Sequence, residues 1–171
     1  MPPHDPDEIF DVVDEADRVV GRAARAVVHR LGLRHRAAHV FLLDSAGRLY
    51  LQRRSLSKDE NPGLWDSSAA GHLDAGETYA EAARRELAEE LGVRVEAAAL
   101  VEVATLPATP ETGQEFRRLF TVTCDDPVHP DPEEVMDGGF FTLADLDRRL
   151  ADGSLEVTPA FRELYARYRR G

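Results

Sequence analysis

Cysteine is nearly missing from the 171-residue sequence, which contains only Cys124. A single thiol cannot form an internal disulfide or a zinc cluster, so the sequence favours the reducing cytoplasm. Long apolar runs are missing as well, since the longest covers about five residues and a bilayer needs roughly 20. The chain starts with polar and acidic residues and shows neither the basic nor the apolar part of a signal peptide. We therefore expect a cytoplasmic protein that neither spans a membrane nor binds to one.

Basic residues are outnumbered, because 21 Lys and Arg stand against 32 Asp and Glu, and the net charge is −11. Binding to duplex nucleic acid draws much of its affinity from neutralised phosphates, so this balance argues against such a partner. Hydrophobic residues make up 43% and charged residues 31% of the chain, which excludes a disordered tail or a fibre. The length fits a single domain over residues 1–171, in which local basic clusters can still bind small phosphates.

Apolar and polar residues alternate in several segments, which predicts strands separated by a few helices. Strands are expected at residues 8–13, 19–21, 39–43, 48–53, 97–105, 116–124 and 140–141, and helices at 143–150 and 158–170. The first two strands form an antiparallel pair in an N-terminal extension, residues 1–34, followed by a short helix or a connection at 22–33. A turn with a glycine at 44–47 joins the next two strands in a predicted hairpin. This mixed order indicates an α/β fold.

Residues 78–91 carry the strongest local signals. Thr78 and Glu81 form a capping box, and Gly92 occupies the place of a C-terminal glycine, so a helix of about four turns is expected. Three glutamates lie three and four residues apart on one face of this helix: Glu86, Glu89 and Glu90. These like charges either form a solvated acidic face or hold a hard cation such as Mg²⁺ or Mn²⁺, which prefers carboxylate oxygens.

The spacing around this helix matches the Nudix box at every fixed position. The box covers residues 71–93, and its fixed positions are Gly71, Glu77, Arg85, Glu86, Leu87, Glu89, Glu90, Gly92 and Val93. The sequence therefore resembles the Nudix hydrolase family. Residues 52–54 and 61–65 extend the resemblance toward a subgroup related to isopentenyl-diphosphate isomerases. The resemblance implies an α/β/α sandwich around a mixed β-sheet, and hydrolysis of a diphosphate linked to another group by attack of water at phosphorus.

The same resemblance implies roles for the residues of the box. Arg85 would orient a glutamate through a charge-assisted hydrogen bond, and Glu77 would support the site from the loop. The ligands of the Mg²⁺ or Mn²⁺ cofactor would be Glu86, Glu89, Glu90 and the carbonyl group of Gly71.

The base that activates water has two candidate locations. Glu86 or Glu89, next to the metal, would accept the proton in the first. Glu111 or Glu115, in the expected loop at 107–115, is the alternative, because family members differ in where this residue lies.

Basic side chains shortly before the box are candidate phosphate ligands. Arg53, Arg54 and Lys58 could bind phosphate oxygens or form a solvated strand end, and strand alternation favours Arg53. A role in the site and a role in the structure both stay open for Trp65, His72, Glu133 and Glu134.

Three functions remain open at this point. The chain could hydrolyse nucleoside di- or triphosphates or their derivatives, isomerise isopentenyl diphosphate, or bind a nucleotide as a catalytically silent regulator. The isomerases carry a catalytic cysteine before the Gly-His pair of the box, and here Ala70 occupies that position, which disfavours isomerisation. The complete box argues against a silent domain. We therefore expect a hydrolase of a small-molecule nucleotide or other diphosphate, in which the N-terminal strand pair extends the sheet or joins a second subunit in a homodimer.

Overall fold

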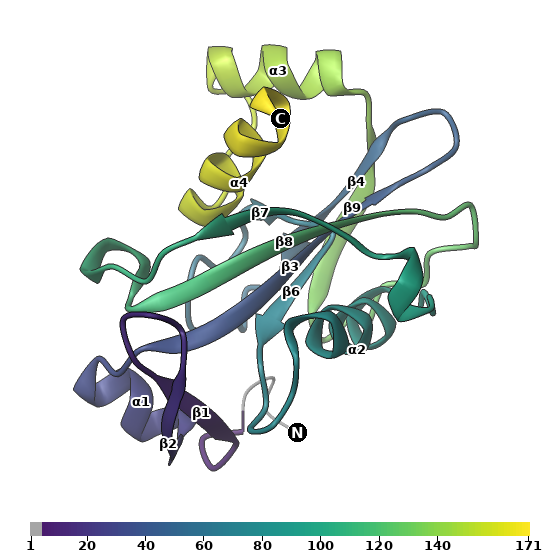
Figure 1. Cartoon of the computed structure of the whole chain (residues 1–171). Helices are drawn as coiled ribbons and strands as arrows, with labels where there is room; N and C mark the ends of the chain where they lie inside the picture. Colours follow the sequence, from purple (N-terminus) through teal and green to yellow (C-terminus); the bar gives the residue numbers. More distant parts are fainter. Residues whose placement is uncertain (1–4) are drawn as a thin grey trace.

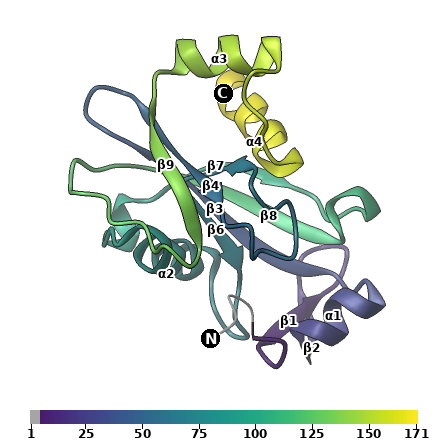
Figure 2. The ribbon, with the colours of Figure 1, turned by 180° about the vertical axis from the view of Figure 1, so that it is seen from behind.

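Helices cover both faces of a mixed sheet in the computed structural model, which describes residues 5–171 (Figure 1). The main sheet has the order β5-β4-β3-β8-β7, with β6 paired to β3 and β9 paired to β4. Its strands are β3 (His35–Leu43), β4 (Leu49–Arg54), β5 (Trp65–Asp66), β6 (Ala69–His72), β7 (Val101–Leu106), β8 (Glu115–Thr123) and β9 (Val135–Phe141). Helix α2 (Tyr79–Leu91) lies on one face, and α3 (Leu143–Asp152) and α4 (Pro159–Arg170) lie on the other (Figure 2). The expected α/β/α sandwich is therefore the observed fold.

Strand β3 supplies side chains to both faces of the sheet, because successive residues of a strand point in opposite directions. Val40 and Leu42 pack in a core that includes Leu87 of α2. Phe41 packs in the opposite core, against Phe161 of α4. Strand β3 also pairs with β8 in parallel and with β6 in antiparallel, which makes the sheet mixed.

The predicted hairpin forms its two strands, but the pairing expected between them is wrong for most of their length. Strands β3 and β4 pair at Leu43 and Leu49, next to the turn, and then separate. The hydroxyl of Ser68 fills the gap, since it accepts a hydrogen bond from the backbone nitrogen of Leu42 (2.8 Å) and donates one to the carbonyl of Tyr50. Strand β6, which the sequence analysis did not predict, then takes the place of β4 beside β3, and β4 pairs with β9.

Two other segments differ from the expected elements. Residues 97–105 begin with the 3₁₀ turn η1 (Ala97–Ala99), and the strand starts only at Val101. Strand β9 is longer than the two residues expected at 140–141. At 22–33, where a short helix or a connection is expected, the structure has a short helix, α1 (Arg25–Leu31).

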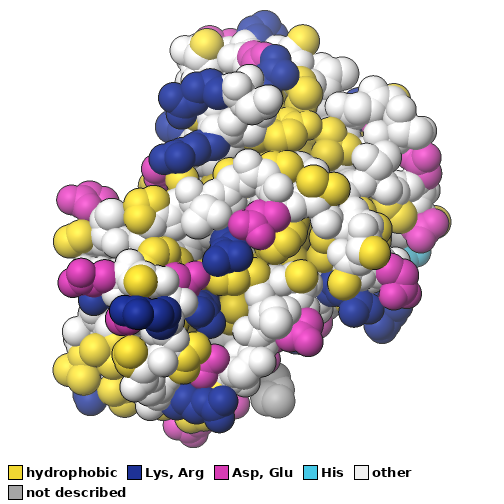
Figure 3. Space-filling model, in the orientation of Figure 1, with side chains coloured by type: hydrophobic (Ala, Val, Ile, Leu, Met, Phe, Trp, Pro, Cys, Tyr) yellow, Lys and Arg dark blue, Asp and Glu magenta, His cyan; other side chains and the backbone are white. Residues whose placement is uncertain are grey.

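The N-terminal strand pair forms a two-stranded sheet of its own. Strands β1 (Ile9–Val13) and β2 (Val19–Ala24) are antiparallel and do not extend the main sheet. They lie beside the loop that leads into α2 (Figure 1). Acidic and basic side chains are interspersed on the face of the molecule shown in Figure 3. No helix among residues 5–171 is long and apolar enough to cross a membrane.

Candidate active site

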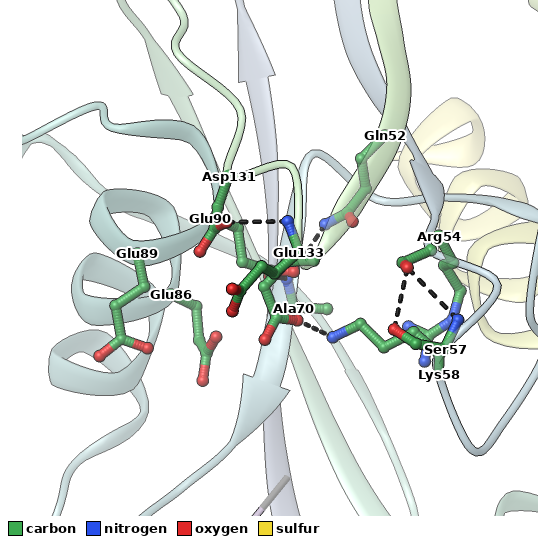
Figure 4. Close-up of polar contacts among 12 residues, drawn as sticks. Gln52, Arg54, Ser57, Lys58, Ala70, Glu86, Glu89, Glu90, Asp131 and Glu133 are labelled. Carbon is green, nitrogen blue, oxygen red and sulfur yellow. Dashed lines mark hydrogen bonds and ion pairs between the residues drawn. The ribbon is translucent and has the colours of Figure 1, made fainter. Parts of the chain in front are cut away.

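Helix α2 begins and ends where the sequence predicts, and this fixes the direction of its glutamates. The hydroxyl of Thr78 accepts a hydrogen bond from the backbone nitrogen of Glu81, and Gly92 ends the helix with a left-handed φ of 66°. The helix buries Leu87 and Leu91 against the sheet. Glu86 and Glu90, on the adjacent face, are turned toward β6, and Glu89 lies farther out (Figure 4).

Glu90 is held in place at the floor of the site. Its side chain is buried, and its two oxygens accept hydrogen bonds from the backbone nitrogen of Ala70 (2.8 Å) and from Nε2 of Gln52 (3.0 Å). Burial raises the pKa of Glu90 to about 7, although the charge of Lys58 opposes the shift. A carboxylate in such a place gains stability from a nearby cation.

Arg85 connects the loop before α2 to the first glutamate of the site. Its Nε and Nη2 donate to the two oxygens of Glu77 (2.8 and 2.9 Å), and its Nη1 donates to Oε1 of Glu86 (2.6 Å). Burial and the charge of Glu90 raise the pKa of Glu86 well above its ordinary value, while Arg85 partly opposes the shift. Glu89 is the most exposed of the three glutamates, with 60% of its side chain accessible and one longer contact, 3.4 Å, to Arg85.

The three glutamates line a cleft of about 330 Å³ that contains an excess of carboxylates. Those that line it are Glu8, Glu86, Glu89, Glu90, Asp131 and Glu134. Gly71 lines the cleft at β6, where a Cβ atom would overlap the carboxylate of Glu86. This set of hard oxygen donors, two of them with pKa values raised by burial, fits a divalent cation such as Mg²⁺ or Mn²⁺.

A second, smaller cavity of about 100 Å³ adjoins the cleft. Its lining contains basic side chains together with the carboxylates of Asp59, Glu60, Asp66 and Glu115. The two spaces share a wall formed by Arg25, Lys58, Ala70, Gly71 and His72, and the cavity adds Arg54 and Arg117 beyond it. Of the three basic residues predicted as phosphate ligands, Arg54 and Lys58 line the cavity. Arg54 forms an ion pair with Asp66 at 3.3 Å, and Lys58 forms one with Glu134.

Arg53, which strand alternation favours as a phosphate ligand, lies outside the residues that line the cavity. Its Nε donates to the carbonyl of Gly63 (2.8 Å), so it holds the 61–64 turn. Strand β4 has an irregularity in its pairing with β9 between Arg53 and Arg54, which breaks the simple alternation of sides. Trp65 packs edge-on against Phe141 in the core on the α4 side.

The two loop candidates for the base lie in different surroundings. Glu111 is exposed in the 3₁₀ turn η2 (Pro110–Thr112) and lines neither space. Glu115 is not in a loop, because strand β8 begins there. Its carboxylate contacts Nε2 of His72 at 2.9 Å and Nε of Arg117 at 2.7 Å. Burial alone would raise the pKa of Glu115, but hydrogen bonds from His35 and His72 hold it well below its ordinary value.

Three histidines lie close together beside Glu115. One ring nitrogen from each of His29, His35 and His72 falls within 4.8 Å of the others, a spacing that a metal ion could use. Burial lowers the pKa values of His29 and His72, which favours the neutral form of both rings. His72 is thus part of a hydrogen-bonded cluster with Glu115 and also lines both spaces.

Comparison with known proteins places this geometry in a family. The NUDIX domain family model matches residues 33–161. The chain belongs to the Nudix family. An isopentenyl-diphosphate Delta-isomerase of Streptomyces griseus is 37% identical over 172 residues, covering 91% of this chain and 86% of the relative. An uncharacterised Nudix hydrolase of Streptomyces coelicolor is also 37% identical, over 95% of this chain and 89% of the relative. A crystal structure of a Deinococcus radiodurans protein covers 94% of this chain and 98% of its own, with 33% identity and a TM-score of 0.79.

Several residues of this Nudix site were not found from the sequence. Arg25 lies in the N-terminal extension, has only 12% of its side chain exposed, and places Nη1 3.2 Å from Nδ1 of His72. Gln52 contacts Glu90, and Asp131 lines the acidic cleft. All three lie outside the Nudix box. Although residues 52–54 extend the resemblance, no local pattern assigns any of the three to the site, and the fold brings them to it.

Proposed function

We propose that this Nudix protein is a metal-dependent diphosphohydrolase that acts on nucleoside di- or triphosphates or their derivatives, by attack of water at phosphorus. One observation carries the proposal. An acidic cleft suited to divalent cations shares a wall that contains Arg25 and Lys58 with an adjoining cavity, whose lining adds Arg54 and Arg117. A substrate could place its anionic diphosphate between the metal ions of the cleft and the basic residues of the wall, and its further group in the adjoining cavity.

The acidic cleft is the proposed place for Mg²⁺ or Mn²⁺. The ligands would be Glu86, Glu89, Glu90 and the carbonyl of Gly71, all of which line the cleft. A bound divalent cation would neutralise the diphosphate and lower the pKa of a coordinated water. Arg85 keeps Glu86 in position through the 2.6 Å contact, and Glu77 keeps Arg85 in position.

Basic residues of the shared wall would bind the phosphates. Lys58 is buried and lines both spaces, so its ammonium group can approach a phosphate that lies between them. Arg25 lines the same wall, and Arg54 lies on the cavity side. A guanidinium group can donate two parallel hydrogen bonds to a phosphate, whereas an ammonium group acts as a point charge.

The proposed base is a carboxylate of α2. Glu89 is exposed to the cleft and has one weak contact with Arg85, so it is free to accept a proton from water. Glu86 is the neighbouring choice, although its carboxylate is already bound by Arg85. Glu115 is a poor alternative, because a carboxylate whose pKa is held so low has little affinity for a proton.

Isomerisation of isopentenyl diphosphate is the second candidate, since that activity is in the name of the Streptomyces griseus relative. Its chemistry needs a thiol at the wall between the two spaces, where this chain has Ala70. Cys124 is half-buried against the core on the α2 side and lines neither space. The site therefore favours hydrolysis.

Two assays test the proposal. Release of phosphate or diphosphate is measured over a panel of nucleoside di- and triphosphates and their sugar derivatives, with Mg²⁺, with Mn²⁺ and with excess EDTA. We expect turnover with metal and none with EDTA, and full turnover in EDTA would contradict the metal assignment. Isopentenyl diphosphate is then incubated with the protein and Mg²⁺ in deuterated water and followed by proton NMR. Dimethylallyl product or deuterium uptake at a catalytic rate would overturn the choice of hydrolysis over isomerisation.

A further inference from the structure

The loop that leads into α2 is held by the N-terminal strand pair. The backbone nitrogen of Ala75 donates to the carbonyl of Ile9 in β1 (2.9 Å). The next amide, that of Gly76, donates to Oδ2 of Asp11, also in β1, at 2.8 Å. Two consecutive amides of the loop are therefore bound by a segment that precedes the residues matched by the family model.

Asp11 is a buried carboxylate with two different partners. Only 5% of its side chain is exposed, and its other oxygen, Oδ1, accepts a hydrogen bond from Nε of Arg22 at 3.1 Å. Arg22 is 62% exposed, so its contribution to the pair is reduced by solvent. Gly76 has a φ of +82°, a backbone conformation that residues with a side chain rarely adopt. In this conformation its N–H group donates to Asp11.

A continuous set of contacts leads from Asp11 to the acidic cleft. The residue after Gly76 is Glu77, whose two oxygens are bound by Arg85, and Arg85 in turn donates to Glu86. A shift of Glu77 would therefore disturb the guanidinium group that also donates to Glu86. The amide that Asp11 binds thus lies one residue from the carboxylate that sets the position of Arg85.

We propose that Asp11 is a positioning residue for the metal-binding glutamates, acting through the Gly76 amide, Glu77 and Arg85. The inference deepens the proposed function and rests on it for its activity readout, but its metal-binding readout stands apart. Substitution of a residue that orients a metal ligand without contacting the metal commonly lowers metal affinity or activity by about 10- to 100-fold.

Three variants separate the contacts of Asp11. Asp11→Ala removes both of them, Asp11→Asn keeps an oxygen that can accept from Gly76, and Arg22→Ala removes only the exposed ion pair. Each protein is titrated with Mn²⁺ and the free ion is counted by electron paramagnetic resonance, while thermal unfolding reports the folded fraction. We expect Asp11→Ala to weaken Mn²⁺ binding and to lower kcat by about tenfold each, with KM little changed. Asp11→Asn and Arg22→Ala should stay within about twofold of the wild type, since both retain an acceptor for Gly76.

A double substitution tests the route. If Asp11 acts through Glu77, adding Asp11→Ala to Glu77→Gln lowers Mn²⁺ affinity by less than the product of the two separate effects. Independent, multiplicative effects would overturn the route. If Asp11→Ala does not fold, Asp11→Ser replaces it, because the shorter side chain leaves a polar group in β1 that does not reach the Gly76 amide.

The outcomes for the two proposals differ. Unchanged Mn²⁺ affinity in folded Asp11→Ala, or equal damage from Asp11→Asn and Asp11→Ala, would overturn the role of Asp11. A lower unfolding temperature with unchanged Mn²⁺ affinity and kcat per folded molecule would mean that Asp11 is only structural, and would overturn it too. A wild-type protein that hydrolyses no diphosphate while Asp11→Ala still weakens Mn²⁺ binding would contradict the proposed function alone. A wild-type protein that does not bind Mn²⁺ would overturn both.

Discussion

Gly71 provides the space that the carboxylate of Glu86 occupies, and filling that space should inactivate the protein without unfolding it. A Cβ atom on residue 71 would overlap the Cδ and Oε1 atoms of Glu86. The clash is with a side chain rather than with backbone, so Gly71→Ala can be accommodated if Glu86 turns away. Glu86 would then lose its contact with Arg85 and its place in the acidic cleft.

The stability change should be small. Loss of the charge-assisted hydrogen bond between Arg85 and Glu86 costs about 1.5–3 kcal/mol. Alanine is favoured over glycine within a strand by roughly 0.5–1 kcal/mol, which offsets part of that loss. A net cost of about 1–2 kcal/mol is well below the roughly 5–15 kcal/mol of a typical folded protein. The effect on hydrolysis should be much larger, a fall in kcat of roughly 100-fold or more, equivalent to about 2.7 kcal/mol.

The assay compares initial rates of hydrolysis and thermal unfolding for Gly71→Ala, wild type and Gly21→Ala. Gly21, in β2, has no atom within 4 Å of an added Cβ, so this control introduces a methyl group without a clash. We expect the control to match the wild type in both measurements. If folded Gly71→Ala hydrolyses at the wild-type rate, the position of Glu86 does not govern the reaction, and the assignment of this glutamate to the metal site fails.

Three further results are expected. Glu89→Gln and Glu90→Gln should each lower kcat by roughly 100-fold or more in steady-state assays, and wild-type kcat in both would indicate a merely solvated acidic face. Mg²⁺ should raise the thermal unfolding temperature at pH 8, because it offsets the cost of burying charged Glu86 and Glu90; an equal temperature in EDTA would argue against binding. Burial lowers the pKa of His39 from 6.5 to about 4, so the unfolded chain binds a proton that the folded one does not. Urea titrations should show that His39 makes the free energy of unfolding fall by about 3 kcal/mol between pH 6.5 and 4, and His39→Asn should lose that part of the slope.

The local parts of the fold and site could be predicted because their signals are close together in the sequence. The capping box at Thr78, the glycine at position 92 and the spacing of the three glutamates all lie within one helix and its ends. The same closeness allowed Glu77 and Arg85 to be selected, and the structure brings their side chains into direct contact. What they do in catalysis remains a prediction.

The distant parts could not be predicted, because they depend on strand pairing. The gap between β3 and β4 follows from Ser68 and the insertion of β6, which local alternation cannot reveal. Lys58 meets Glu134 across 76 positions of sequence, and Gln52 meets Glu90 across 38. The sequence favoured Arg53 among the candidate phosphate ligands because it assumed a regular strand. The pairing of β4 with β9 is irregular after Arg53, and Arg54 is the arginine that lines the cavity.

The wall that the acidic cleft shares with the adjoining cavity has a consequence for substrate length. Lys58, Ala70 and Gly71 line both spaces, so under the proposed function these residues would set the distance between the metal and the leaving group. A substrate whose terminal group fills the cavity would place its phosphates along the shared wall, between the cavity and the metal. A diphosphate and a triphosphate with the same terminal group would then present different phosphorus atoms to the attacking water. The length of the wall would then determine which phosphorus atom is attacked, and this would depend on the number of phosphates rather than on the group that they carry.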